Sequence, residues 1–515
     1  MKDLRIAIIG AGIGGLSAAL ALVSRGAEVT VLERAAQPGG KVREVAIGDS
    51  AVASGPTVFT MRPVFDEIFA EAGADFTARV VARPAEILAR HAWSTREQLD
   101  LYADLHRSAA AIGELAGPAE ARRYLAFCAA ARKTFDTLER TFIRAQRPTP
   151  LSLVQRTAAV GMHRLLHIRP FTTLWAALQS HFNDPRLRQL FGRYATYCGS
   201  SPYEAPATLM LVAHVEQEGV WLLDDGIQRL AEAMRELAVE RGATFRFGTA
   251  VAEIELHGGR ASAVIDSHGE RQACDAVVCN ADPAALASGH FGAAVRAAMP
   301  GPPRRQRRSL SSLTWSIEAP TQGFALLHHN VFFSRDYRRE FDDIFRRGRV
   351  PFEPTVYVCA QDRGRASATP EPGANERLFC LVNAPAVGDT HEFGTEEVEQ
   401  CATRTFSVLK RCGLEVARDP ERTVVTTPSD FERMFPATGG ALYGQASHGW
   451  RASFDRPAAS TRIPGLYLAG GGTHPGPGVP MAAVSGRLAA QQLLADQAST
   501  GRWRRAAMPG GTSMP

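Results

Sequence analysis

The sequence predicts an α/β protein whose dinucleotide-binding domain is assembled from separate segments of the chain. Two glycine-rich strand–turn–helix patterns carry this prediction, one at residues 4–34 and the other at residues 465–494. A third observation is the order of the chain between them, where a mainly helical block and a strand-rich block interrupt the pattern. We therefore expect one sheet-centred domain that carries two insertions.

The first pattern is a complete βαβ unit of the Rossmann type. A β-branched strand, Leu4–Ile9, leads into the turn G-x-G-x-x-G, and an apolar helix follows at about Gly14–Arg25. The glycines allow a tight turn and bring a pyrophosphate close to the free N–H groups of the helix. A second strand, Glu28–Leu32, ends at an acid that can bind ribose hydroxyls. The predicted nucleotide-binding residues are Gly10, Gly12, Gly14, Gly15, Glu33 and Arg34.

The apolar run Ile6–Val23 has a second interpretation. It carries no charge and follows Lys2 and Arg5, which is also the pattern of a membrane span or a signal peptide. Its glycines favour the strand–turn–helix interpretation over a membrane span or a signal peptide, because they are clustered in one turn where the strand–turn–helix unit requires them. No other run in the chain is long and apolar enough to cross a bilayer.

Composition excludes several classes of protein. With 45% apolar and 22% charged residues, the 515-residue chain resembles an ordinary protein of two or three domains, and its net charge of +5 is too small to predict a nucleic-acid partner. The eight cysteines form no C-x-x-C pair, which is typical of reduced thiols in a cytosolic protein. We expect no metal site, because His163/His167 and His328/His329 have no carboxylate or cysteine at ligand spacing.

Two further turns follow the first unit. The turn Pro38–Arg43 is rich in glycine and is expected to border the pyrophosphate, with Lys41 or Arg43 near it. The turn Ser54–Val58 has small residues that would let the backbone approach a flat ring, and a plain β-turn explains them equally well. The predicted cofactor-binding residues of these turns are Gly40, Lys41, Arg43, Gly55, Pro56, Thr57 and Val58.

The block 76–214 is mainly helical in pattern. Its segment Met162–Trp175 is unusually apolar and carries or adjoins Arg156, Arg164 and Arg169. Core packing is the ordinary role of such a stripe, and the alternative is a helix that dips into the interface of a bilayer.

The segment 215–285 is expected to return to the dinucleotide-binding domain. A helix, Ile227–Arg241, precedes alternating strands that end at Asn280, and this order brings Val251 near the adenine. The segment 286–424 has the strands and the helix of a second, α/β insertion.

The second glycine-rich pattern completes the domain. A strand that starts at Gly465 runs into a stretch of small residues, and a helix, Ala482–Leu494, follows. Such a turn can hold a ribityl chain and place the helix N-terminus near a flavin carbonyl. Two units at opposite ends of one chain favour FAD over NAD. The predicted binding residues here are Gly471, Gly472, Pro480 and Met481.

These patterns define the expected domains. The discontinuous FAD-binding domain comprises residues 1–75, 215–285 and 425–495. The insertions are residues 76–214 and 286–424, and residues 496–515 form a tail that we expect to be disordered from Arg502 onward.

Several motifs together resemble the bacterial phytoene desaturase group of carotenoid desaturases, which are related in fold to amine oxidases. They are GAGIGGLSAAL, Gly55-Pro56-Thr57, the loop Gly199–Pro202 with Ala205–Ala207, and GGGTHPGPGVPMAAVSG, and they extend from residue 4 to about residue 495. Within the group, GPTVFTM, HHNVFFS and GVW look most like the branch of the hydroxyneurosporene and methoxyneurosporene desaturases. One departure is Asp225, where relatives often have glycine, and any role for Asp225 stays open.

The resemblance implies an FAD-dependent enzyme that forms the C-3,4 double bond of an acyclic 1-hydroxy or 1-methoxy carotenoid, by hydride transfer to flavin N5 and loss of a proton. It also implies an apolar substrate tunnel built from the two insertions, and a monotopic protein that docks on a membrane surface through Met162–Trp175. The protein would be cytoplasmic and peripherally membrane-associated. Oxygen or a membrane quinone would accept the electrons, because no second Rossmann motif is visible for NAD(P).

Other functions are compatible with the same motifs. A phytoene or neurosporene desaturase, a carotenoid isomerase, or an isoprenoid-binding protein that keeps FAD for stability would share them. A flavin amine oxidase is less favoured, because the chain has four lysines and only Lys41 is near a motif. We assign no catalytic residue. The candidates, for each of which a structural role is favoured, are Glu204, Asp224, His328 and Asp336.

Overall fold

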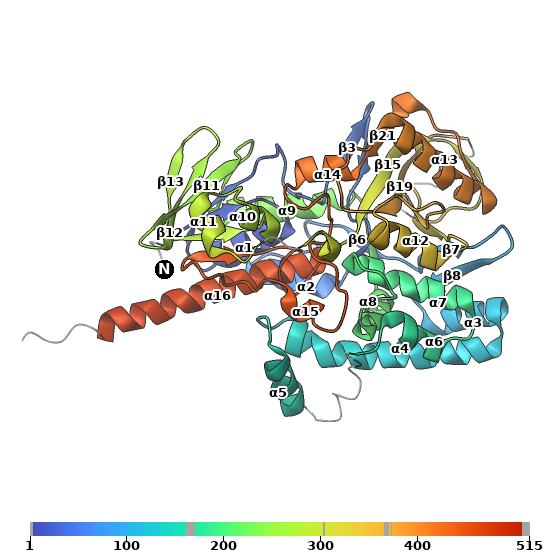
Figure 1. The fold of residues 1–515 in the computed structure, drawn as a ribbon, viewed down its shortest axis with the longest axis horizontal. Helices are drawn as coiled ribbons and strands as arrows, with labels where there is room; N and C mark the ends of the chain where they lie inside the picture. The colour runs from blue at the N-terminus through green and yellow to red at the C-terminus, as the bar shows by residue number, and fades with distance from the viewer. Residues whose placement is uncertain are drawn as a thin grey trace, which may run out of the picture.

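The computed structural model describes residues 4–160, 169, 171–301, 304–364, 370–371 and 373–506. The molecule is elongated, with a parallel sheet and its helices at one end and a larger sheet at the other (Figure 1). A layer of helices lies beneath the larger sheet. The predicted mixture of helices and sheets is confirmed.

The parallel sheet gathers strands from both ends of the chain. Its order is β10-β2-β1-β14-β22, and every neighbouring pair is parallel. The carboxyl ends of these strands therefore meet at one edge, with a switch in strand order between β1 and β14. The strands are β1 (Arg5–Ile9), β2 (Glu28–Leu32), β10 (Thr244–Arg246), β14 (Ala276–Cys279) and β22 (Leu466–Leu468).

Helix α1 (Ile13–Val23) is buried along its whole length between the sheet and two other helices. These are α9 (Gln228–Glu240) and the long α16 (Val479–Ala506), the red helix of Figure 1. Because α1 consists largely of Gly, Ala and Ser, its neighbours approach closely, and the Ser17 hydroxyl donates a hydrogen bond to the Ala483 carbonyl at 2.7 Å. The strand–turn–helix interpretation of this stretch is confirmed.

The predicted meander follows as an antiparallel sheet, β11 (Val251–His257), β12 (Arg260–Asp266) and β13 (Arg271–Ala273). The short helices α10 (Pro283–Ser288) and α11 (Ala293–Ala298) come after β14. Asp282 caps α10, because its carboxylate accepts a hydrogen bond from the backbone N–H of Ala284.

The larger sheet has the order β21-β15-β19-β18-β17-β7-β8. The hairpin β7–β8 belongs to the block that the sequence predicts as mainly helical, and it joins this sheet through parallel pairing of β7 with β17. The strands are β21 (Thr423–Thr426), β15 (Ser311–Ala319), β19 (Glu376–Ala384), β18 (Val356–Ala360), β17 (His329–Phe332), β7 (Ile87–Ala92) and β8 (Gln98–Tyr102).

The two faces of this sheet differ in their neighbours. On β15, the apolar residues Leu313, Trp315 and Ile317 pack into the core that also includes residues of α13 (Thr395–Arg411). The alternate residues of β15 are small and polar, and Ser312 and Thr314 line a cavity. The small polar residues of β15 therefore lie on the face of the sheet that borders this cavity.

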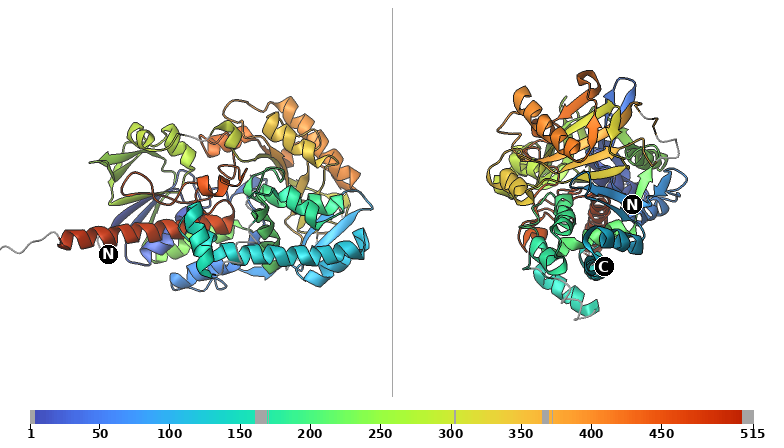
Figure 2. Two further views of the ribbon diagram at one scale, coloured as in Figure 1. Left: turned by 60° about the horizontal axis from the view of Figure 1, so that its bottom comes forward. Right: turned by 90° about the vertical axis from the view of Figure 1, so that its right-hand side faces the viewer.

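The helical layer comprises α3 (Leu105–Ala116), α4 (Pro118–Leu138), α6 (Leu174–His181), α7 (Pro185–Gly192) and α8 (Leu211–Glu218). Aromatic residues such as Phe127, Phe182 and Phe191 form its core. A π-helical turn, Glu139–Ile143, leads to α5 (Pro150–Val160), which stands away from the body of the molecule (Figure 2).

Smaller elements connect these parts. They are β3 (Glu44–Ile47), β4 (Ser50–Ala53), β5 (Phe59–Thr60), β6 (Ala82–Pro84), β9 (Val220–Leu223), β16 (Thr321–Gly323), β20 (Leu414–Val416), α2 (Arg62–Glu71), α12 (Tyr337–Phe341), α14 (Pro428–Met434) and α15 (Ala452–Asp455).

The last helix extends to Ala506, so that the predicted tail from residue 496 begins inside it, because the helix formers Ala, Gln and Arg continue past Leu494. Residues 507–515 lie outside the described part. Most of the segment Met162–Trp175 also lies outside it, although Phe171 is 81% exposed. None of the described helices is long and apolar enough to span a membrane.

Candidate active site

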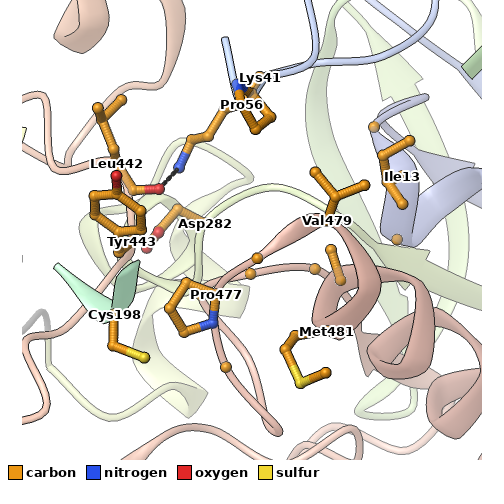
Figure 3. A pocket seen from close by; sticks show the side chains of 18 of the residues that line it. Ile13, Lys41, Pro56, Cys198, Asp282, Leu442, Tyr443, Pro477, Val479 and Met481 are labelled. Atoms are coloured by element: carbon orange, nitrogen blue, oxygen red, sulfur yellow. Dashed lines mark hydrogen bonds between the residues drawn. The ribbon is translucent and has the colours of Figure 1, made fainter. Parts of the chain in front are cut away.

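A cavity of about 1100 Å³ lies between the two sheets and reaches the helical layer. This exceeds the roughly 300–1,000 Å³ of an ordinary ligand pocket. Figure 3 shows residues from both ends of the chain in its wall, such as Ile13 of α1 and Val479 and Met481 of α16. All the residues predicted to bind the cofactor line this cavity except Gly15, which packs on the Gly10 carbonyl instead.

The nucleotide end of the cavity is built around the N-terminus of α1. Gly10 has φ +94°, a conformation that side chains disfavour, and a Cβ on Gly12 would stand 2.7 Å from Asn280 Nδ2. A Cβ on Gly14 would stand 2.8 Å from the Gly470 backbone. Since α1 has no side-chain cap, its first N–H groups are free to face a pyrophosphate.

Glu33 follows β2 at the same edge of the sheet. Its carboxylate accepts hydrogen bonds from the backbone N–H groups of Ala11 at 2.6 Å and Ala35 at 2.8 Å, and the residue is buried. These bonds orient the carboxylate and leave lone pairs for ribose hydroxyls. Val251 lines the same end, where it was expected near the adenine.

The basic residues of the turn Pro38–Arg43 are engaged by the C-terminal part of the chain. Lys41 Nζ donates a hydrogen bond to the Leu442 carbonyl at 2.6 Å (Figure 3) and lies 5.1 Å from the Phe435 ring centroid. Burial lowers the pKa of Lys41. Arg43 donates a hydrogen bond to Thr426 Oγ1 at 2.9 Å. Both residues line the cavity, and their contacts fix the segments that enclose it.

Three residues that sequence reasoning missed complete this end. Asn280 follows β14 and packs its amide against the glycine turns, and Asp282 lines the cavity beside it. Arg456 is buried and donates hydrogen bonds to the carbonyls of Tyr443, Gln445 and Gly471. The position of Asn280 directly after a buried parallel strand was a signal that could have found it.

Away from the nucleotide end, the cavity has an apolar arm. Aliphatic and aromatic side chains from α4, the π-helical turn, α5, the 3₁₀ turn Ala207–Met210 and α8 line it, and the arm leads toward the base of α5. Leu151, Val154, Phe171 and Trp450 are exposed there, and the rings of Phe171 and Trp450 lie 5.6 Å apart. The residues of this arm are Leu138, Phe142, Ile143, Leu153, Val154, Leu209, Leu211, Val212 and Val215.

The comparisons with known proteins agree with this geometry. Residues 13–494 match the family model described as flavin containing amine oxidoreductase. The chain belongs to this family. Hydroxyneurosporene desaturase of Rubrivivax gelatinosus is 51% identical over 524 residues, which cover 100% of this chain and 97% of that protein. The protein of the same name from Cereibacter sphaeroides is 42% identical over 498 residues, which cover 97% and 99%.

A solved structure extends the comparison to the fold. An oxidoreductase from Methanosarcina mazei matches with a TM-score of 0.60 at 16% identity, and the match covers 96% of this chain and 100% of that one. The likeness shows a shared fold. The predicted resemblance to carotenoid desaturases is confirmed by the relatives above.

Members of this flavoprotein family carry FAD, and the site fits it. A Cβ would collide with the Gly470 backbone at Gly14 and with the side chains of Asp282 and Pro283 at Gly472. Both glycine turns border the one cavity that Glu33 also lines. Gly12, Gly14 and Glu33 would hold the pyrophosphate and ribose, and the turn Gly55–Val58 with Gly471 and Gly472 would lie toward the ring. The chain is therefore an FAD-dependent oxidoreductase.

None of the four candidate bases lines the cavity. Glu204 faces His448 at 3.3 Å, Asp224 pairs with Arg83 at 2.6 Å, and Asp336 caps α12. Their contacts within the described residues give them structural roles.

Cys359 of β18 joins the His328–His329 pair, which sequence spacing did not indicate. Their ligand atoms lie within 4.8 Å of one another. However, His328 Nδ1 lies 2.8 Å from the Arg363 carbonyl, and His329 Nδ1 lies 2.7 Å from the Tyr357 hydroxyl. These hydrogen bonds account for the positions of the two histidines. None of the three residues of this cluster lines the cavity.

Proposed function

We propose that the protein introduces the C-3,4 double bond into an acyclic 1-hydroxy or 1-methoxy carotenoid. The observation that carries this proposal is that the nucleotide-binding end and an apolar arm belong to one cavity of about 1100 Å³. An amine or another small polar substrate does not need such an arm, whereas a polyene does. The names of the relatives at 51% and 42% identity support the same substrate class.

The chain supplies position and a dry environment to the reaction. When bound, FAD accepts the hydride at its N5 atom. Leu138, Phe142 and Val212 hold the polyene in one orientation, which lowers the entropic part of the barrier. Because the arm is apolar, bulk water is kept from adding to the allylic carbon as positive charge develops there. The conjugated chain spreads that charge until the proton is lost to water at the mouth of the cavity.

We also propose that the protein docks on a membrane at the mouth of the apolar arm. Its substrate dissolves in the bilayer, and α5, from which Leu153 and Val154 line the cavity, stands away from the body (Figure 2). Leu151 is 68% exposed and Phe171 is 81% exposed. Arg147 and Arg451, both exposed, lie in the adjoining segments, where they can contact anionic headgroups. The docked protein would be peripheral on the cytoplasmic side.

Oxygen or a membrane quinone would then reoxidise the enzyme. Docking brings the mouth of the cavity to the layer that contains quinones. Turnover in quinone-containing liposomes with and without oxygen separates the two acceptors.

Product analysis tests the proposed function. Purified holoenzyme is incubated in liposomes with a 1-hydroxy carotenoid, the 1-methoxy analogue, neurosporene, phytoene and an aliphatic diamine. We expect a red-shifted product two hydrogens lighter from the first two substrates. Conversion of phytoene or neurosporene alone would support an earlier desaturase, a product of unchanged mass would support an isomerase, and oxidation of the diamine would support an amine oxidase.

A further inference from the structure

Arg193 is a charged residue in the wall of the cavity. It begins the 3₁₀ turn Arg193–Cys198 after α7 and lines the cavity together with Tyr197 and Tyr357. Its guanidinium carbon lies 5.2 Å from the ring centroid of Tyr197 and 6.0 Å from that of Tyr357. The Tyr357 hydroxyl is 2.7 Å from Thr57 Oγ1, so that Arg193 is close to the turn expected to approach the flavin ring.

The guanidinium has few partners among the described residues. One hydrogen bond, from Arg193 Nη2 to the Tyr197 hydroxyl at 3.2 Å, uses one of its five N–H donors. Among the described residues no carboxylate lies within ion-pair distance of it, and the charge of Glu216 acts on it from farther away. Tyr197 lies between Arg193 and Glu216. The carboxylate of Glu216 accepts one hydrogen bond from the Tyr197 hydroxyl at 2.5 Å and another from the Tyr194 hydroxyl at 2.7 Å.

The cavity wall around Arg193 is largely apolar. The sheet above it contributes Phe379 and Leu381, and the helical layer contributes the aliphatic residues of the apolar arm. Ser312 and Thr314, each 1% exposed, also line the cavity, and their buried hydroxyl groups have no hydrogen-bond partner among the described residues. A cation with unused donors is costly beside an apolar ligand unless that ligand brings an acceptor.

We propose that Arg193 binds the oxygen atom on C-1 of the substrate and thereby selects oxygenated carotenoid ends over hydrocarbon ends. The inference rests on the proposed function and deepens it. The oxygen on C-1 is only a few bonds from the C-3,4 bond, so its binding group must lie beside the flavin and not at the outer end of the arm. Arg193 is placed there through its contacts with Tyr357 and, beyond it, Thr57.

The chemistry of arginine defines the ligand further. A guanidinium only donates hydrogen bonds, so it binds a hydroxyl oxygen and a methoxy oxygen in the same way. A hydrocarbon end offers no acceptor, and the guanidinium would remain unsatisfied against it. Sites that hydrogen-bond a substrate group discriminate strongly against an analogue that lacks the group. Arg193 is thus a specificity-determining residue of this reaction.

The test is the ratio of kcat/KM for a 1-hydroxy carotenoid to that for the hydrocarbon of the same length, measured with FAD-loaded protein in liposomes. Arg193→Met should lower this ratio roughly 10- to 100-fold, because one hydrogen bond to a charged group is lost. Arg193→Lys keeps the charge without the planar fork and should lower it less. The ratio for the 1-methoxy substrate should fall in parallel. Arg132→Met, on an α4 residue whose side chain is 72% exposed, is the matched control.

The ratio is measured within each variant, so a loss of active protein cancels from it. An unchanged ratio in Arg193→Met, or an equal loss of rate on both substrates, would overturn the inference and give Arg193 a structural role. If Arg193→Met does not retain FAD, Arg193→Lys decides, since an unaltered ratio in that variant also contradicts the inference. Wild-type protein that converts no 1-hydroxy carotenoid would instead reject the proposed function.

Discussion

Gly486 of α16 packs directly against Gly14 of α1. A Cβ on Gly486 would stand 2.1 Å from the Gly14 carbonyl oxygen. The contact joins helices from opposite ends of the chain, and both helices begin at the edge of the same cavity. The two glycine-rich patterns therefore serve one binding site because α1 and α16 touch along their backbones.

Gly486→Ala tests this helix contact. The added methyl group has to displace backbone, so we expect a loss of about 1–3 kcal/mol in the free energy of unfolding and a lower FAD content. Gly113→Ala is the matched control in α3, where the new Cβ would meet Ala121 at an ordinary 3.6 Å. The control should be stabilised by up to about 1 kcal/mol. Urea unfolding and flavin absorbance measure both effects, and equal stability of the two variants would refute the close contact.

Glu33→Gln tests the nucleotide end. The neutral amide keeps the shape of the side chain but loses charged hydrogen bonds to Ala11 N–H and to a ribose, so FAD affinity should fall roughly 10- to 100-fold. The control is Glu28→Gln at the exposed start of β2. Equilibrium dialysis of apoprotein with FAD gives the dissociation constants. Equal affinity in both variants would place the ribose elsewhere.

The stability of the protein should fall in acid. Burial lowers the pKa of His91 to about 3, with a smaller contribution from the charge of Arg193, and burial also lowers the pKa values of His329 and His474. The folded-state pKa of His91 lies below its unfolded value of about 6.5. Its contribution is therefore complete above about pH 6.5 and is lost as pH falls toward the folded pKa, by about 1.4 kcal/mol per pH unit.

Urea unfolding between about pH 7 and about pH 5 measures this slope. His91→Gln should flatten it, whereas His257→Gln, at an exposed residue at the end of β11, should leave it unchanged. A slope that is the same in all three proteins would mean that folding does not lower the pKa of His91.

Membrane docking has its own test. Replacing the exposed aromatic residues at the cavity mouth, in Phe171→Asp with Trp450→Asp, should lower binding to anionic vesicles roughly tenfold or more. The same change at Val239, 45% exposed on α9, is the control and should have little effect. Sedimentation with vesicles measures the bound fraction. Binding that is unaffected by the aromatic replacements would place the docking surface elsewhere.

The nucleotide-binding half of the site was predictable from the sequence, because its signals are local. In Gly10, Gly12 and Gly14 the backbone itself makes the cradle, and the strand and helix around them follow from hydrophobic patterning. Glu33 follows the same logic, since it ends a buried strand. The role of Gly15 in packing on Gly10, and not in lining the cavity, depends on the exact path of the turn.

The other half depends on contacts between distant segments. The hairpin β7–β8 joins the larger sheet because β7 pairs with β17, and no local sequence pattern predicts this pairing. Arg193 follows a short helix and looks like an ordinary surface arginine in the sequence, yet the fold turns it into the cavity. Cys359 reaches His328 and His329 only because β18 pairs with β17.

Anaerobic reduction of the bound flavin by substrate is the most direct test of a cavity shared by FAD and a polyene. Oxygen-free holoenzyme is mixed with one equivalent of a 1-hydroxy carotenoid in liposomes, and flavin and polyene absorbance are followed together. We expect the oxidised flavin band to bleach at the same rate as the polyene band shifts to the red. Flavin that stays oxidised while the carotenoid is unchanged would contradict the shared cavity as the site of reaction.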